Sequence, residues 1–331
     1  MANFGSVFVV IAFIITAVHC DGQEPPLRLV QTISLNGVEK RIDHLAVDLV
    51  HQHLFVAALG NNSVEVVDLR GSRRVYNIAG LHEPQGIAYV PSSNRIFVAN
   101  GQSGACAGFD GTTYKQVATI AFSGDADNVR YDEKAKQIVV GFGDGALGFF
   151  NAETCANNGT VILSGHPESF QLEKHGNRIF VNVPSAGHIA VVDRVKRRLL
   201  ITWPVEAARA NFPMALDEAG HRLFIGCRSP GRVLVYDTNT GKQVGTFELA
   251  GDTDDVFYDS KNRQLYASCG AGFIDVIQEK KPFQFERTAH IATAVGARTC
   301  LFVPELQRLY LAVPRRGSQQ AEIRVYSVAA R

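Results

Sequence analysis

One short strand pattern recurs seven times along the chain, and it constrains the fold more than any other feature. The pattern is an aliphatic residue, then an aromatic residue or valine, then a small or aliphatic residue, as in residues 54–56. Its central residues are Phe55, Phe97, Val139, Phe180, Phe224, Tyr266 and Tyr310, so successive copies lie 41 to 44 residues apart. Self-similarity at such a period is typical of propellers and solenoids.

Polar residues keep the same step and mark the ends of further strands within the repeat. Seven residues before the central position stand Asp48, Asp132, Glu173, Asp217 and Asp259. Twelve or thirteen residues after it stand Asp68, Asp110, Asn151, Asp193 and Asp237. A turn and a weaker strand follow, as in residues 244–249. Four short strands rich in β-branched and aromatic residues make one propeller blade.

The two ends of the repeat region indicate how the ring closes. The seventh repeat ends at residues 323–328 with no fourth strand after it, and residues 29–35 have the pattern of the fourth strand at 244–249. We therefore predict an all-β, seven-bladed β-propeller with four strands per blade, closed by the N-terminal strand in the last blade. Closure removes two open sheet edges. A solenoid would need polar end caps instead. Residues 28–331 form this single domain.

The N-terminal segment is typical of an export signal. Residues 7–18 are apolar apart from Thr16, and Cys20 and Asp21 end the run. A membrane-spanning helix needs about 20 apolar residues, so this shorter run fits a signal-peptide core better. We predict a signal peptide at residues 1–20 and a linker at 21–27, with an uncleaved anchor as the alternative. The mature protein is then expected in the periplasm, on the cell surface or outside the cell, without a transmembrane segment.

Composition excludes some classes of function. The formal net charge is +1 and the pI about 7.7, so no global field attracts polyanions, and we expect no dedicated nucleic-acid binding. The six cysteines show neither zinc-site spacing nor a haem-attachment motif. Nothing indicates an oligomer, and we expect a monomer. Basic residues also gather in the turns between third and fourth strands. They form either a solvated surface or a weak contact site for a polyanion. These residues are Arg70, Arg73, Arg74, Arg194, Lys196, Arg197, Arg198, Lys280 and Lys281.

Several repeats resemble a known propeller family. Phe97-Val98-Ala99-Asn100 and Phe180-Val181-Asn182 stand where the YVTN-type repeats of exported YncE-like proteins carry Tyr-Val-Thr-Asn. The segment Pro84-Gln-Gly-Ile-Ala88 is similar to the opening of a strand in that family. The third and sixth repeats depart from it, with Gly124-Asp-Ala-Asp-Asn128 and Gly251-Asp-Thr-Asp-Asp255. The resemblance implies a periplasmic or cell-surface setting and a binding role, and it supplies no catalytic residue.

In a propeller, the loops that lead into the innermost strands surround one opening of the central channel, the mouth. These seven mouth loops are residues 40–44, 82–85, 124–128, 165–169, 209–213, 251–255 and 295–299. Carboxylates concentrate in three of them: Asp125, Asp127, Glu168, Asp252, Asp254 and Asp255. Arg41 and Arg298 offset only part of this charge. Ca²⁺ or Mg²⁺, which prefer oxygen ligands, would suit such a cluster. The alternative is that the aspartates hold their own loops through Asx-type turns.

The predicted ligand-binding residues are Arg41, His44, Gln85, Asp127, Asn128, Glu168, Asn211, Asp254, Asp255 and Arg298. Four of them, Asp127, Glu168, Asn211 and Asp254, are the candidate ligands of a divalent cation. His44 and His166 are candidate catalytic bases, although no motif fixes a reaction.

Three functions stay open. The leading interpretation is an exported binding propeller whose acidic mouth engages a small polar ligand, a cation or a loop of a protein partner. The rival is a hydrolase or lyase in which a bound metal polarises a lactone or a sugar-derived substrate. The third is a purely structural envelope protein. Because no catalytic motif is present, we favour binding over catalysis.

Overall fold

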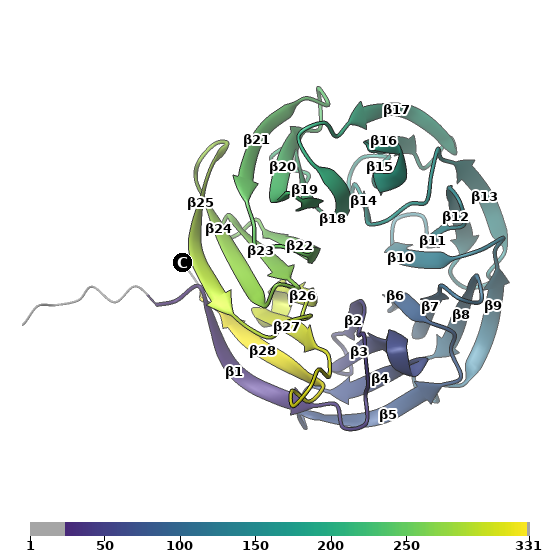
Figure 1. Cartoon of the computed structure of the whole chain (residues 1–331). Helices are drawn as coiled ribbons and strands as arrows, with labels where there is room; N and C mark the ends of the chain where they lie inside the picture. Colours follow the sequence, from purple (N-terminus) through teal and green to yellow (C-terminus); the bar gives the residue numbers. More distant parts are fainter. Residues whose placement is uncertain (1–23, 330–331) are drawn as a thin grey trace, which may run out of the picture.

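The computed structural model describes residues 24–329 and confirms the seven-bladed β-propeller. Seven four-stranded antiparallel sheets stand around a central axis, with the first strand of each blade innermost (Figure 1). The predicted signal peptide at residues 1–20 lies outside the described residues, as do residues 21–23 of the predicted linker. Residues 24–329 contain no helix that is long and apolar enough to span a membrane.

Each blade uses its four strands in the same order. The innermost strands are β2 (Leu45–Asp48), β6 (Pro84–Val90), β10 (Ala126–Asp132), β14 (Phe170–Leu172), β18 (Arg209–Asp217), β22 (Thr253–Asp259) and β26 (Thr299–Val303). The second strands carry the sequence repeat: β3 (His53–Ala58), β7 (Arg95–Asn100), β11 (Gln137–Phe142), β15 (Arg178–Val183), β19 (Arg222–Ser229), β23 (Gln264–Cys269) and β27 (Arg308–Val313).

The outer half of each blade completes the sheet. The third strands are β4 (Ser63–Asp68), β8 (Ala105–Asp110), β12 (Ala146–Asn151), β16 (His188–Asp193), β20 (Gly231–Asp237), β24 (Phe273–Lys281) and β28 (Glu322–Val328). The outer strands are β5 (Arg73–Ala79), β9 (Gln116–Ala121), β13 (Asn157–Ile162), β17 (Arg198–Pro204), β21 (Gln243–Glu248), β25 (Gln284–Ala292) and β1 (Leu27–Ser34). Three single 3₁₀ turns accompany them, at Leu59–Asn61, Pro184–Ala186 and Pro304–Leu306.

The predicted ring closure is confirmed. Strand β1 lies against β28 as the outer strand of the last blade, with Leu27 opposite Val328 and Ser34 opposite Glu322. The first and last strands of the chain thus lie side by side (Figure 1). Every sheet of the ring then has four strands. Without β1, the last blade would have only three strands, and β28 would be left as an open edge.

The hydrophobic core is divided into seven clusters, each between two neighbouring blades. The aromatic residue of the repeat supplies the centre of most of them, since Phe55, Phe97, Phe180 and Phe224 are fully buried. Burial of these side chains explains why the repeat demands a large apolar residue at this position. The five cysteines among the described residues are all free thiols, and four of them are buried in these clusters as small apolar residues.

At their mouth ends, four innermost strands depart from regular pairing. The register shifts between Pro84 and Ile87 in β6, and at the corresponding places in β10, β18 and β22. Such bulges turn consecutive side chains away from strict alternation. Close contact between blades also requires a glycine here, because a Cβ on Gly86 would lie 2.4 Å from the carbonyl oxygen of Asp127. The bulges therefore affect which side chains at the mouth point toward the axis.

Candidate functional site

Side chains from all seven blades surround a cavity of about 170 Å³ at the mouth. Its lining residues are Arg41, Asp43, His44, Gln85, Asp125, Asp127, His166, Glu168, Phe212, Arg228, Asp254 and Arg298. All of them except Arg228 belong to the mouth loops. Pockets for drug-sized molecules measure roughly 300–1,000 Å³, so this cavity has room for an ion or a small polar molecule.

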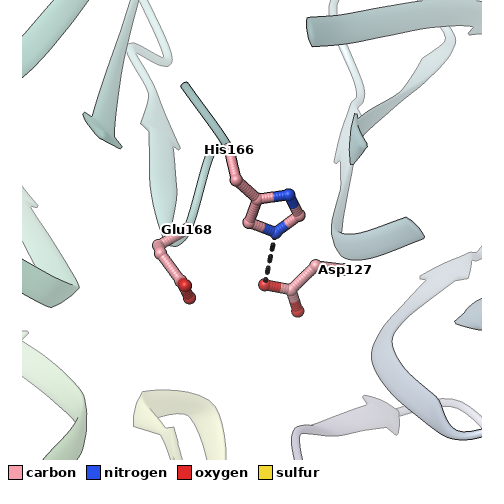
Figure 2. Close-up of side chains that lie close together, drawn as sticks. All are labelled: Asp127, His166 and Glu168. Atoms are coloured by element: carbon pink, nitrogen blue, oxygen red, sulfur yellow. Dashed lines mark ion pairs between the residues drawn. The ribbon is translucent and has the colours of Figure 1, made fainter. Parts of the chain in front are cut away.

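Three of these side chains form a group that can hold a metal ion. One ligand atom from each of Asp127, His166 and Glu168 lies within 4.8 Å of the others. Nδ1 of His166 donates to the carbonyl oxygen of Gly143 at 2.6 Å, and Nε2 faces Asp127 Oδ2 at 3.6 Å (Figure 2). The backbone carbonyl therefore holds the ring with Nε2 toward the carboxylates. Metal-binding histidines are oriented in this way by a hydrogen bond from the second ring nitrogen.

The close packing of Asp127, His166 and Glu168 shifts the pKa values of the last two residues. The hydrogen bond to Asp127 raises the pKa of His166 to about 9. Burial, together with the charge of Asp127, raises the pKa of Glu168 to about 8. In the absence of a cation, both groups thus hold protons at neutral pH. A metal ion takes the place of such protons when it binds.

A second acidic centre lies at the loop of the sixth blade. Arg228 donates from Nη2 to Asp254 Oδ1 and from Nε to the carbonyl oxygen of Thr253. Its guanidinium lies 4.1 Å above the ring of Phe212, which fixes it against the cavity wall. Burial raises the pKa of Asp254 to about 6 in spite of this arginine. Oδ2 of Asp254 is buried and accepts no hydrogen bond from the described residues.

The first blade supplies the floor of the cavity. Arg41 Nη2 lies 2.7 Å from Asp43 Oδ2, and the ring of His44 lies between Asp43 and Asp255 at 3.7 and 3.4 Å. Burial alone would lower the pKa of His44, but the charge and hydrogen bond of Asp255 raise it to about 10. At neutral pH His44 is a cation, and a protonated imidazole has no lone pair with which to bind a metal or accept a proton.

The charges of the mouth are more evenly balanced than its sequence indicates. Five carboxyl groups line the cavity, together with three arginines and two histidines. The sequence reasoning set only Arg41 and Arg298 against the acids. Arg228 and the protonated forms of His44 and His166 supply the remaining positive charge. The cavity therefore presents both signs of charge at close range, which suits a polar or zwitterionic ligand.

The structure brings most of the predicted ligand-binding residues together. Arg41, His44, Gln85, Asp127, Glu168, Asp254 and Arg298 line the mouth cavity, as does the second candidate base, His166. Gln85 donates to Asp125 at 3.1 Å, and Arg298 lies 2.9 Å from Asp252 at the rim.

Three predicted residues point elsewhere. Asn211 is buried, and its amide donates to Asn182 Oδ1 at 3.0 Å and so ties two blades together. Asn128 is buried beside Asp127 and does not line the cavity. Asp255 accepts the backbone N–H of Cys300 at 2.9 Å and lies below the mouth, in the channel. Their neighbours Asp127 and Asp254 line the cavity instead, and both lie within the bulges of β10 and β22, where the regular pairing is interrupted.

Sequence reasoning missed Arg228, which lies at the end of a second strand rather than in a mouth loop. A signal was nevertheless present. Four residues after the central position of the repeat, the other six blades carry Leu59, Gly101, Gly143, Pro184, Gly270 and Pro314. An arginine at this position occurs only in the fifth blade. In an antiparallel blade, the turn after the second strand lies on the same face as the mouth loops.

The basic turns are used mainly for internal contacts. Arg194 is buried, with Nη1 3.2 Å from Asp132 Oδ2, and Arg74 pairs with Glu65 at 3.0 Å. Arg197 lies 3.9 Å above the ring of Phe149. These arginines stabilise the blades, so only part of the predicted basic surface is available to a polyanion.

Comparison with known proteins identifies the fold. No protein-family model matches the chain, and no curated protein matches it by sequence. Among solved structures, that of U3-55K superposes with a TM-score of 0.78 at 11% identity, covering 90% of this chain and 98% of the other. The RRP9 WD40 repeats give the same TM-score and identity, with 90% and 97% covered. The mitotic checkpoint complex gives 0.76 at 13% identity, with 97% and 99% covered. At this identity the likeness establishes a seven-bladed β-propeller and leaves function to the site.

Proposed function

We propose that this chain is an exported binding propeller, which holds a divalent cation at its mouth and there engages a small polar ligand or a loop of a protein partner. The orientation of His166 carries the proposal: its Nδ1–H is held by the Gly143 carbonyl, and Nε2 faces Asp127 and Glu168. The apolar segment at residues 7–18 and the resemblance to exported YncE-like proteins support the location.

The ligand set determines which cations to test. Two carboxylates suit Ca²⁺, Mg²⁺ and Mn²⁺, whereas an imidazole nitrogen favours Mn²⁺ and Zn²⁺ over the first two. Asp127 and Glu168 were predicted as metal ligands, and His166 takes the place that the sequence assigned to Asn211. Asp254 lies in the same cavity, with a buried oxygen that accepts no hydrogen bond from the described residues.

The arginines of the mouth suit the second part of the proposal. Arg41 is half exposed, and Arg298 and Arg228 line the cavity on the side of the sixth blade. A ligand with a carboxylate or phosphate group can bridge a cation and such arginines, since guanidinium groups bind both kinds of anion through two N–H donors. One of the similar structures is a complex, which favours a partner loop as an alternative occupant.

Calorimetric titration of chelator-treated protein with Ca²⁺, Mg²⁺, Mn²⁺ and Zn²⁺ tests the cation site. We expect one cation per chain, with affinity that rises between pH 6.5 and 9. The rise follows because His166 and Glu168, with pKa values of about 9 and 8, must lose protons to become ligands. The double variant Asp127→Asn with Glu168→Gln should abolish binding.

Asp193→Asn is the matched control, because Asp193 accepts backbone N–H groups in a turn on the opposite face. This variant should bind the cation like the wild type. If none of the four cations binds, or if the double variant binds as well as the wild type, the cation site is refuted. A chain that binds neither cation nor small ligand would fit the structural role instead.

A metal-assisted hydrolase or lyase is a second candidate, favoured by the pKa of Glu168. A carboxyl group with a pKa of about 8 can act as a general acid or base near neutral pH. A panel of lactones, assayed with and without added cation, tests this function. Hydrolysis that requires the cation and is lost in Glu168→Gln would establish it, and the absence of turnover with a bound cation would leave a binding protein.

A further inference from the structure

A second cavity lies below the mouth, inside the ring. It has a volume of about 300 Å³, and residues of all seven innermost strands line it. Most of its wall is apolar: Leu45, Ala46, Ile87, Ala88, Val129, Met214, Val256, Phe257 and Leu301. His44 lines both this channel and the mouth cavity, so the two lie one above the other along the axis.

Arg130 of β10 brings a positive charge into this apolar wall. Its Nη1 donates to the carbonyl oxygen of Val129 at 3.0 Å, and its guanidinium lies 5.5 Å above the ring of Phe170. No carboxylate among residues 24–329 forms an ion pair with it. Asp255 is the one acid among the residues that line the channel, and it is occupied by His44 and by the backbone N–H of Cys300.

The two buried arginines among the described residues, Arg194 and Arg222, are neutralised by carboxylates, whereas Arg130 is partly exposed to the cavities that it lines. Arg194 pairs with Asp132, and Arg222 pairs with both Asp217 and Glu279. Arg130 differs because burial lowers its pKa, and the more distant charges of Asp255 and Asp127 offset this only in part. Because no carboxylate of the described residues pairs with Arg130, an anion that enters the channel gains a charge-assisted contact with its guanidinium.

Access to Arg130 does not depend on the mouth. A third cavity, of about 510 Å³, opens on the opposite face between the third and fourth blades. Arg130, Tyr131 and Gln171 line both this cavity and the channel. Lys134 and Lys174 stand on its walls beside Glu133, while the acids Asp132 and Glu173 of the same walls are paired with arginines, so the lining keeps a small excess of positive charge. The channel and this third cavity therefore adjoin at Arg130, Tyr131 and Gln171, on the side away from the mouth.

We propose that the central channel binds an organic monocarboxylate with an apolar body. The carboxylate pairs with the guanidinium of Arg130, and the apolar part lies against side chains such as Ile87, Met214 and Leu301. This site is separate from the cation site at the mouth, and either one can exist without the other.

Calorimetry on the purified protein at pH 7 tests the proposal with three probes, which separate the effect of the apolar body from that of the negative charge. Phenylacetate has both an apolar body and a carboxylate, phenylacetamide has the body without the charge, and inorganic phosphate has the charge without the body. We expect one phenylacetate per chain and at least tenfold weaker binding of the other two. Arg130→Gln should weaken phenylacetate binding by about tenfold or more, since hydrogen bonds between charged groups are the strong ones.

Arg197→Gln is the control, because Arg197 also stacks on a phenylalanine ring but lies outside the channel. It should bind phenylacetate like the wild type. If Arg130→Gln does not fold, Leu301→Phe decides, since it narrows the channel without a change of charge and should weaken binding at least tenfold. Unchanged binding in either folded channel variant, or equal binding of phenylacetamide or phosphate, overturns the proposal. If removal of divalent cations changes the affinity for phenylacetate, the ligand binds at the mouth, and the proposal of a channel site is overturned as well.

Discussion

Carboxyl groups at the two faces of the ring behave in opposite ways. At the mouth, burial raises the pKa values of Asp43, Asp125, Glu168 and Asp254. On the opposite face, where the first and third strands end, hydrogen bonds from turn residues lower the pKa values of Asp110, Asp193 and Asp237. The same residue type thus carries a stabilised charge on one face and a destabilised charge on the other.

This contrast separates loop-stabilising acids from site acids. Asp237 accepts N–H groups from Asn239 and Thr240 in an Asx-type turn, which was the alternative explanation for every mouth aspartate. No such backbone N–H bond is formed by Asp127, Glu168 or Asp254 among the described residues. Carboxyl groups in a cavity whose pKa values are raised without backbone donors indicate a functional site rather than a loop contact.

The largest effect is expected on the face opposite the mouth. Asp132→Ala removes the partner of the buried Arg194, which lies 3.2 Å away. An uncompensated buried charge should lower the free energy of unfolding by about 3–5 kcal/mol. Urea denaturation measures the loss. Asp127→Ala at the mouth should cost far less, and an equal cost at the two positions would break the contrast between the faces.

The pH dependence of thermal unfolding should show both faces at once. In cation-free protein, folding raises the pKa of His166 from 6.5 to about 9 and that of Glu168 from 4.5 to about 8. The folded state then binds more protons than the unfolded state, so the melting temperature should fall as pH rises from about 4.5, where Glu168 begins to contribute, to about 9, where the contribution of His166 ends. The lowered pKa values on the opposite face act in the other direction, with stability lost as pH falls below about 4.

A single substitution isolates the contribution of Glu168. Glu168→Gln keeps the shape of the neutral side chain and removes its ionisation. It should leave the stability of cation-free protein nearly unchanged at pH 4, below the unfolded pKa of 4.5, and increase it by about 1 kcal/mol or more at pH 9. Chemical denaturation at the two pH values measures the difference. A loss of stability at pH 9 would mean that the ionised form of Glu168 stabilises the fold.

The smallest effect is expected for an exposed turn. Asp237→Ala removes the acceptor for Asn239 and Thr240, and it should cost about 1 kcal/mol at pH 7. Cation binding, measured by titration calorimetry, should stay at the wild-type level. A change in cation affinity would connect this turn with the mouth and weaken the distinction between the faces.

The fold was predictable because the same packing arrangement between neighbouring blades occurs seven times. Residues such as Phe97 and Phe224 fill equivalent clusters between blades, so the repeat records both the strands and their spacing. The closing strand was predictable for the same reason, since β1 has the pattern of the outer strands.

The inner surface of the mouth was only partly predictable. A regular strand would place alternate side chains toward the axis, but bulges interrupt β6, β10, β18 and β22 just where they reach the mouth. The sequence therefore identified both Asp254 and Asp255 and could not distinguish which one faces the cavity. Arg228 came from another part of the blade, and its role depends on stacking against Phe212.

The pairing of β1 with β28 also bears on the order in which the strand pairs form during folding. Every other strand pair joins neighbours along the chain, whereas Ser34 must wait for Glu322 before its strand has a partner. We therefore expect the ring to close last, after all seven repeats are available, because contacts of such long sequence separation form slowly. Before closure, β1 and β28 would lack each other as partners, and the cavities at the axis would not yet be enclosed.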